Sequence, residues 1–376
     1  MQMDYFHDEF SLSDDFVYLN HAAIAPWPTR TKNAVQAFAE QNAQTGSLYY
    51  PQWLDHEKDL RQLLAQLIHV PEQDLALVKN TSEGLSIVAH GLPWQAGDNI
   101  VIPQQEFPSN RVVWQSLADR QVEVRTVDIL ATDEPEKLIM DATDSHTKLL
   151  SVSSVQYGTG LVLALPALGE FCRRKNILFC VDAIQSVGCV PFDAQAAQAD
   201  FVAADGHKWL LGPEGLGLFY CRATLRDRLT LHEYGWHMLA KPNDFQANTW
   251  QVACDARRFE CGSPNMLGVF ALHASVSLLA QVGMVNIQRK IVDNTQYLFD
   301  ALQAMPGVTL LTDTRAGRFA GIVSFKHAGN TEKLYNHLIK NQIFCAQRGG
   351  GIRFSPHFYT PRSHLDRALE TIRAFL

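Results

Sequence analysis

The segment ADFVAADGHKWLLGPEGLGLF, residues 199–219, combines an apolar, strand-like run with a polar turn and then a turn rich in glycine and proline. Lys208 stands where the predicted strand passes into the loop, and Trp209, Leu210 and Leu211 follow it. Burial disfavours the ammonium form of a lysine and lowers its pKa, which an amine nucleophile requires. Since a lysine in a polar turn can equally be a solvated surface residue, Lys208 alone does not decide between the two interpretations.

A second element, one predicted strand upstream, favours the functional interpretation. Residues 177–188 read ILFCVDAIQSVG and place Asp182 at the carboxyl end of an apolar run, with Gln185 three residues later. A buried carboxylate is costly unless it meets a cation or a donor. In open α/β sheets, ligands bind at this edge. A protonated pyridine nitrogen would satisfy Asp182, and Lys208 could hold the same ring through a Schiff base.

The D-x-x-Q pattern from Asp182 and the later G-H-K-W around Lys208 resemble the pyridoxal 5′-phosphate (PLP) enzymes of fold type I. The closest resemblance is to the class V aminotransferase family, which includes cysteine desulfurases, kynureninases and isopenicillin N epimerase-like enzymes. The resemblance implies an α/β fold with a mostly parallel central sheet, helices on both of its faces and a small C-terminal α/β domain. It also implies PLP as the cofactor, a homodimer and no metal.

The order of predicted elements along the chain agrees with this architecture. Strand-like and helix-like runs alternate from residue 75 to residue 220, as in βα units that build a parallel sheet. We therefore predict an N-terminal segment over the active site (residues 1–28), a large PLP-binding domain (29–283) and a small domain (284–376). Within the second of these, GSLYYPQW (46–53) is predicted to be a loop between two helices.

The resemblance also implies roles for individual residues at the cofactor. Thr81 and Ser82 are predicted to cap a helix, with Glu83 in its first turn, and free N–H groups at such an end can cradle a phosphate. An aromatic ring stacks on the pyridine ring, and Phe107 is the match. The remaining residues predicted to bind the cofactor or substrate are Gln156 near its phenolic oxygen, Gln185 and His207 at the phosphate or phenolic oxygen, Ser263 from the neighbouring subunit, Arg353 at the substrate carboxylate, and Asn20 and His21 in the N-terminal segment.

Composition restricts the other classes of function. The net charge of −7 and the pI near 6.0 provide no basic stripe for nucleic acid. The seven cysteines form no C-x-x-C pair and mostly lie in apolar runs, so they are predicted to be reduced thiols rather than metal ligands. The acidic start MQMDYFHDEF lacks an apolar signal region, and no apolar run is long enough for a bilayer. We expect a cytoplasmic protein that acts on a small amino acid or amine, without nucleic acid or membrane partners.

The sequence leaves the reaction open. Cysteine desulfurases need a nucleophilic cysteine on a loop before the carboxylate-binding arginine, but Cys345 lies in the apolar run IFCAQ, where a thiol is inert. Persulfide-forming desulfuration is therefore disfavoured, and an aminotransferase is the first prediction. A C–S lyase or desulfurase-like enzyme and an epimerase are the alternatives. A catalytically silent PLP-fold binding module is the non-enzyme alternative, against which the joint presence of Lys208, Asp182 and Arg353 argues.

Overall fold

The computed structural model describes residues 6, 8–13, 15–246 and 248–376. The helices are α1 (Thr29–Thr45), α2 (Tyr50–Leu67), α3 (Thr81–Gly91), α4 (Ser109–Gln115), α5 (Pro135–Asp141), α6 (Leu165–Lys175), α7 (Met266–Val282), α8 (Met284–Gln303), α9 (Thr331–Lys340) and α10 (Arg362–Phe375). The strands are β1 (Val17–Tyr18), β2 (Leu75–Val78), β3 (Asn99–Pro103), β4 (Glu123–Val127), β5 (Thr147–Ser153), β6 (Leu178–Asp182), β7 (Phe201–Asp205), β8 (Gly217–Cys221), β9 (Val308–Leu310), β10 (Val323–His327), β11 (Ile343–Phe344), β12 (Ala346–Arg348) and β13 (Gly351–Phe354).

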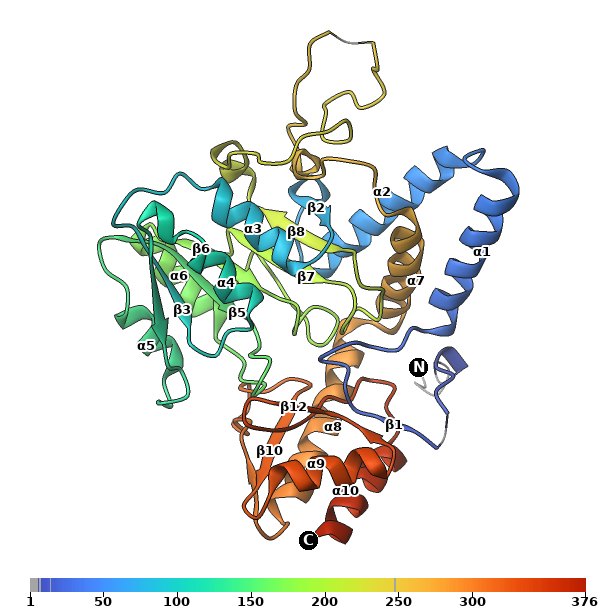
Figure 1. The fold of residues 1–376 in the computed structure, drawn as a ribbon, viewed down its shortest axis with the longest axis vertical. Coiled ribbons are helices and arrows are strands. Elements are labelled where there is room, and N and C mark those ends of the chain that lie inside the picture. Colours follow the sequence, from blue (N-terminus) through green and yellow to red (C-terminus); the bar gives the residue numbers. More distant parts are fainter. Residues whose placement is uncertain (1–5, 7, 14, 247) are drawn as a thin grey trace.

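A seven-stranded sheet with the order β2-β8-β7-β6-β5-β3-β4 forms the centre of the large part of the chain (Figure 1). The strands from β7 to β4 are parallel to their neighbours, and β8 is antiparallel to both β7 and β2. Along β6, Phe179 and Val181 pack into one core and Leu178 and Cys180 into the other, because successive side chains point to opposite faces. The sheet is therefore buried on both faces, which confirms the predicted mostly parallel α/β fold.

The C-terminal part is built on a four-stranded antiparallel sheet with the order β12-β13-β10-β9, at the bottom of Figure 1. Side chains of α8, α9 and α10 share a hydrophobic core with these strands. The N-terminal segment joins this part, because β1 pairs in parallel with β11. The domain boundaries after residues 28 and 283 stay a prediction.

One predicted loop is helical in its second half, whereas residues 46–49 do connect the two helices. Residues 46–53 were expected to connect two helices, but α2 already begins at Tyr50 and has Pro51 in its first turn. A proline suits this place because its fixed φ matches the helix and its missing N–H needs no partner there. Trp53 belongs to this helix and is buried, 6% exposed.

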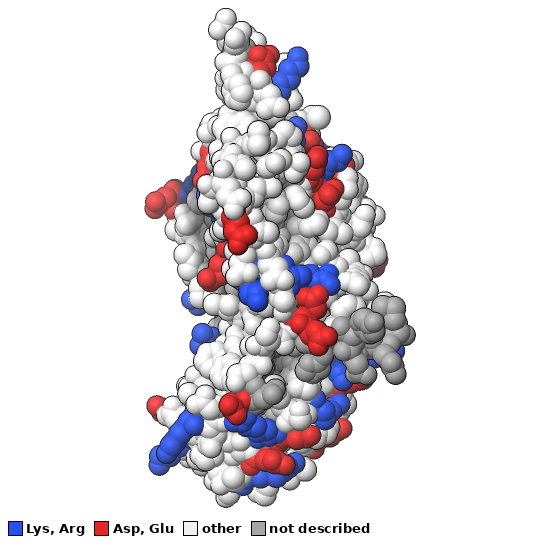
Figure 2. All heavy atoms as spheres, turned by 90° about the vertical axis from the view of Figure 1, so that its right-hand side faces the viewer, with Lys and Arg blue, Asp and Glu red and all other residues white. Residues whose placement is uncertain are grey.

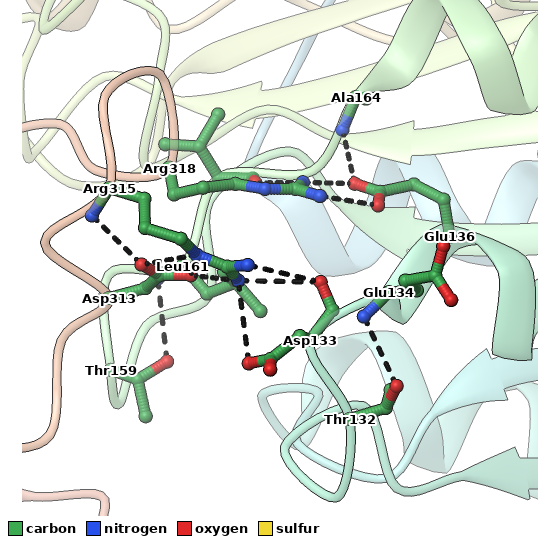
Figure 3. A network of polar contacts seen from close by, with 11 residues as sticks. Thr132, Asp133, Glu134, Glu136, Thr159, Leu161, Ala164, Asp313, Arg315 and Arg318 are labelled. Atoms are coloured by element: carbon green, nitrogen blue, oxygen red, sulfur yellow. Dashed lines mark hydrogen bonds and ion pairs between the residues drawn. The ribbon is translucent and has the colours of Figure 1, made fainter.

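A polar network attaches residues 313–318 of the C-terminal part to the region of α5 (Figure 3). Arg318 pairs with both carboxylate oxygens of Glu136, and the same carboxylate accepts the Ala164 backbone N–H at 2.7 Å. Arg315 pairs with Asp313 at 2.6 Å and reaches the Asp133 carbonyl. These contacts fix the chain that follows β5, and Tyr157 of that chain lines the cavity described next.

Along the described chain, no single helix is long and apolar enough to span a membrane. The one pair that qualifies by length and composition, α7 with α8, is bent by 83°.

Candidate active site

A cavity of about 350 Å³ lies at the carboxyl edge of the large sheet. Its walls come from the N-terminal segment, the start of α3, the turn before α4, the ends of β6 and β7, and the β12–β13 hairpin. Parallel strands bring their carboxyl ends to one edge, and the β5, β6 and β7 register places Ser153, Asp182 and Ala203 side by side there. The sheet topology thus gathers residues that lie far apart in the sequence.

Lys208 and Asp182 face this cavity together and are only 8% and 2% exposed. Burial lowers the pKa of Lys208 and raises that of Asp182, and each charge partly offsets this shift in the other. Asp182 also accepts the Ile184 backbone N–H at 3.1 Å. The Lys208 Nζ lies 5.5 Å from the centre of the Phe107 ring, so an amine, a carboxylate and a ring face bound the same space.

The start of α3 forms one end of the cavity, and its cap differs from the prediction. The capping residue is Asn80, whose side chain accepts the Glu83 backbone N–H at 3.0 Å, and Thr81 is the first helical residue. Thr81 and Ser82 line the cavity. Glu83 is not among the lining residues, because its side chain folds back to the Lys79 backbone N–H. Asn80 could have been recognised, since asparagine is a preferred N-cap residue.

Glu106 was missed by the sequence analysis. It is 3% exposed and accepts hydrogen bonds from Ser153, Asn110 and Gln156. Burial raises the pKa of this carboxyl group, and the hydrogen bonds oppose the shift. Because the Gln156 Nε2 donates to Glu106 at 2.9 Å, the Gln156 amide is fixed in one orientation. No sequence pattern marked this glutamate, which precedes the predicted stacking residue by one position.

Gln185 and His207 occupy the predicted region, and Gln185 has hydrogen-bond partners within the chain. The Gln185 Nε2 donates to the Ala22 carbonyl at 3.0 Å, and its Oε1 accepts from the Trp209 indole at 2.8 Å. Gln185 therefore ties the N-terminal segment to the turn that carries the lysine. The His207 Nδ1 lies 3.0 Å from Asp205 Oδ1, and both residues line the cavity.

Arg353 reaches the cavity from β13 although it is only 2% exposed. Its guanidinium donates to the Tyr157 carbonyl at 2.7 Å. Burial is the main cause that lowers the pKa of Arg353, to about 10, and the charge of Arg348 adds to the effect. Tyr157 was not predicted, and its ring also meets Phe107 edge-on, with centroids 5.1 Å apart.

Five predicted residues do not line the cavity of this chain: Glu83 and Gln156, described above, and Asn20, His21 and Ser263. His21 is fully buried, with Nδ1 2.8 Å from the Ser355 carbonyl and Nε2 2.6 Å from the Tyr359 hydroxyl. Burial lowers the pKa of His21 to about 4, so its ring is neutral near pH 7. The exposed Ser263 accepts a hydrogen bond from the Trp236 indole at 3.2 Å. The backbone of residues 22–24 lines the cavity instead.

The residues present fit PLP. Among the buried side-chain atoms without a hydrogen-bond partner in the described chain, four belong to residues that line the cavity: Thr81 Oγ1, Asp205 Oδ1, His207 Nδ1 and Arg353 Nε. Such atoms are costly to bury unless a ligand satisfies them. Thr81 is placed for a phosphate at the helix N-terminus, Asp182 for a pyridine nitrogen and Phe107 for the ring face.

Comparisons with known proteins agree on the family to which this chain is similar. The family model described as "Aminotransferase class-V" matches residues 17–366. A "Probable cysteine desulfurase" of Methanothermobacter thermautotrophicus is 29% identical, over 97% of this chain and 96% of its own. An "Uncharacterized aminotransferase YcbU" of Bacillus subtilis is 30% identical, over 84% of this chain and 82% of its own. A solved structure of the cystine C–S lyase C-DES with its product cysteine persulfide superposes with a TM-score of 0.88 at 23% identity, covering 96% of this chain and 97% of that one.

Proposed function

Since the chain belongs to the class V aminotransferase family, we propose that it is a C–S lyase that cleaves the Cβ–S bond of a sulfur-containing amino acid. The family is PLP-dependent, and the chain is accordingly a PLP-dependent enzyme of this class. The lyase assignment is the alternative named in the sequence analysis. Relatives named cysteine desulfurase and the likeness to a cystine lyase support it more than they support the first prediction, an aminotransferase.

The side chains of the cavity suit an elimination. When bound, PLP supplies an electron sink for the bond that breaks at the substrate Cα. Arg353 holds the substrate carboxylate, for which its planar fork is suited. Lys208, whose pKa burial lowers, removes the Cα proton as a general base. Asp182 keeps a proton on the pyridine nitrogen. The thiolate leaves from Cβ, and water completes the reaction to a 2-keto acid and ammonium.

The observation that carries the proposal is the absence of a usable thiol at the site. None of the described residues that line the cavity is a cysteine. Cys345 is 2% exposed in the core of the C-terminal part, and burial raises the pKa of its thiol to about 12. A protonated, buried thiol cannot accept sulfur from a substrate. The sulfur therefore leaves with its own substituent, as in a lyase.

We expect the holoenzyme to convert L-cystine or an S-substituted L-cysteine to pyruvate, ammonium and the released thiol or persulfide. Cys345→Ala should retain at least about half of the wild-type rate, because general-base chemistry at Lys208 does not involve this thiol. The measurement is product analysis of both proteins with cofactor content determined in parallel. A stoichiometric amino-group transfer to added keto acids without pyruvate would favour the aminotransferase. If Cys345→Ala no longer released sulfur while the wild type did, the result would instead support a desulfurase.

We also propose that the enzyme is a homodimer in which Ser263 of one chain approaches the cofactor phosphate of the other. The segment between β8 and α7 stands out at the top of Figure 1 and exposes large apolar side chains, with Tyr234 and Trp250 both 61% and Phe245 80% exposed. On the face in Figure 2, charged side chains of both signs gather over the C-terminal part, whereas in the upper part they lie mainly along the edges and leave the middle largely uncharged. Exposed apolar groups of this size are typical of an interface.

Sedimentation of the holoenzyme is expected to show a dimer, and Ser263→Ala should weaken PLP binding about threefold to tenfold, as expected for one lost hydrogen bond. Ser277→Ala, on α7, is the matched control, since its hydroxyl is bonded to the Ala274 carbonyl at 2.8 Å within the same helix. A fully active monomer would contradict this arrangement.

A further inference from the structure

Two arginines lie on the same face of the β12–β13 hairpin. In its register Ala346 is opposite Arg353 and Arg348 is opposite Gly351. Residues directly opposite each other share a face, and so do residues two apart on one strand. Arg348 is therefore the diagonal neighbour of Arg353, a relation that places such side chains about 7–8 Å apart.

Both guanidinium groups border the active-site cavity. Arg353 lies at depth and Arg348 is exposed at the rim, and both line the cavity. The charge of Arg348 contributes to the lowered pKa of Lys208 and of Arg353, which places it within electrostatic reach of both. The hairpin is held close to the neighbouring loop, since a Cβ at Gly349 would lie 2.8 Å from the Gly158 carbonyl oxygen.

Neither arginine has a carboxylate partner in the described chain. The ion pairs among the described residues include neither of them. The Arg348 side chain donates only to the Gln347 carbonyl at 2.9 Å, and Arg353 donates to a carbonyl as well. Two unpaired guanidinium groups in one cavity favour an anionic ligand with more than one acidic group, because like charges side by side repel each other.

We propose that Arg348 binds a second carboxylate of the substrate, located on the group attached to the sulfur atom. The inference rests on the proposed C–S lyase function, and it names the substrate class: an S-substituted L-cysteine whose sulfur substituent ends in a carboxylate. Arg353 takes the α-carboxylate, and Arg348 takes the distal one. The Cβ–S bond breaks, and the sulfur keeps the bonding electron pair and leaves as a thiolate whose substituent carries the distal carboxylate. Hydrolysis of the remaining part yields pyruvate and ammonium, without an added oxidant or reductant.

A pair of isosteric probes tests this assignment. S-(2-carboxyethyl)-L-cysteine carries the distal carboxylate, and S-(2-carbamoylethyl)-L-cysteine carries a neutral amide of the same shape. For the wild-type holoenzyme, kcat/KM is expected to be about tenfold higher for the carboxylate, as one exposed charge-assisted contact allows. Arg348→Gln should remove this preference, mainly through KM. Lys326→Gln, which removes an exposed cation of β10 outside the cavity lining, should retain it.

Other outcomes would overturn the inference. If Arg348→Gln lowered kcat/KM equally for both probes, both arginines would hold the same α-carboxylate. A wild-type enzyme that does not distinguish the probes would mean that no distal anion is recognised.

Calorimetric binding of heptanedioate and of its monoamide to the holoenzyme separates this inference from the proposed reaction. If neither L-cystine nor the two cysteine probes yield pyruvate, the lyase function fails. An Arg348-dependent preference for the dicarboxylate would still support the distal anion site, and its absence would overturn that site.

Discussion

Lys208→Ala is expected to abolish turnover and the covalent attachment of PLP to the chain. General acid–base catalysis by a positioned group contributes about 100-fold to 10,000-fold, so we expect a loss of about 1,000-fold or more in kcat. The reason is geometric, because Lys208 is the buried lysine that lines the cavity together with Asp182 and Arg353. The measurement combines turnover with borohydride reduction of the holoenzyme, proteolysis and mass spectrometry of the labelled peptide.

The label should appear on the peptide that contains Lys208. Lys32→Ala removes an exposed lysine of α1 and serves as the control, with unchanged labelling and rate. A cofactor attached to any other lysine, or a Lys208→Ala variant with near-normal turnover, would refute the assignment.

Arg61→Met is expected to produce the largest loss of stability of any single change considered for this chain. Arg61 on α2 pairs with Glu57 at 2.8 Å and with both carboxylate oxygens of Glu260, and all three side chains are buried. It also donates to the Leu75 carbonyl at 2.9 Å. Removing the cation leaves two carboxylates in the interior, which costs about 3–5 kcal/mol. Urea unfolding of the holoenzyme and of the variant, at matched cofactor saturation, measures the difference.

Arg30→Met provides the contrast, because the Arg30–Glu9 pair is partly solvated, with side chains 29% and 18% exposed. Its loss should change stability by about 1 kcal/mol or less. Replacing Glu57 and Glu260 by glutamine in the Arg61→Met background should restore part of the stability, since the buried charges are then gone. An Arg61→Met variant as stable as the wild type would show that the cluster is solvated in solution.

The sequence was sufficient to locate the site residues that lie at or just after the carboxyl ends of strands. An apolar run that ends in a charged residue marks the carboxyl edge of a parallel sheet, and Asp182 and Lys208 were located in this way. The sequence was insufficient where tertiary contacts determine the orientation of a side chain. His21 follows a strand of the N-terminal segment, but its partners are Ser355 and Tyr359, which only the folded C-terminal part supplies.

Glu106 is a second residue whose tertiary contacts could not be predicted from the sequence. Its carboxylate accepts hydrogen bonds from Asn110, a few positions later on the same segment, and from Ser153 and Gln156, which lie far away in the sequence. The local sequence around Glu106 does not show that these two segments meet. The cap of α3 was a different case. Asn80, Thr81 and Ser82 are all suitable capping residues, and only the backbone conformation, extended at Asn80, selects one of them.

The parallel pairing of β1 with β11 also has a consequence for biosynthesis. Val17 and Tyr18 are synthesised long before their partners Ile343 and Phe344. Contacts between such distant residues are slow to form, and domains made first generally fold first. β1 therefore lacks its partner strand until β11 has been synthesised, whereas all strands of the large sheet precede β11 in the sequence. Residues 22–24, which form one wall of the cavity, follow closely after β1, so we expect this wall to take its place only once Ile343 and Phe344 have been synthesised.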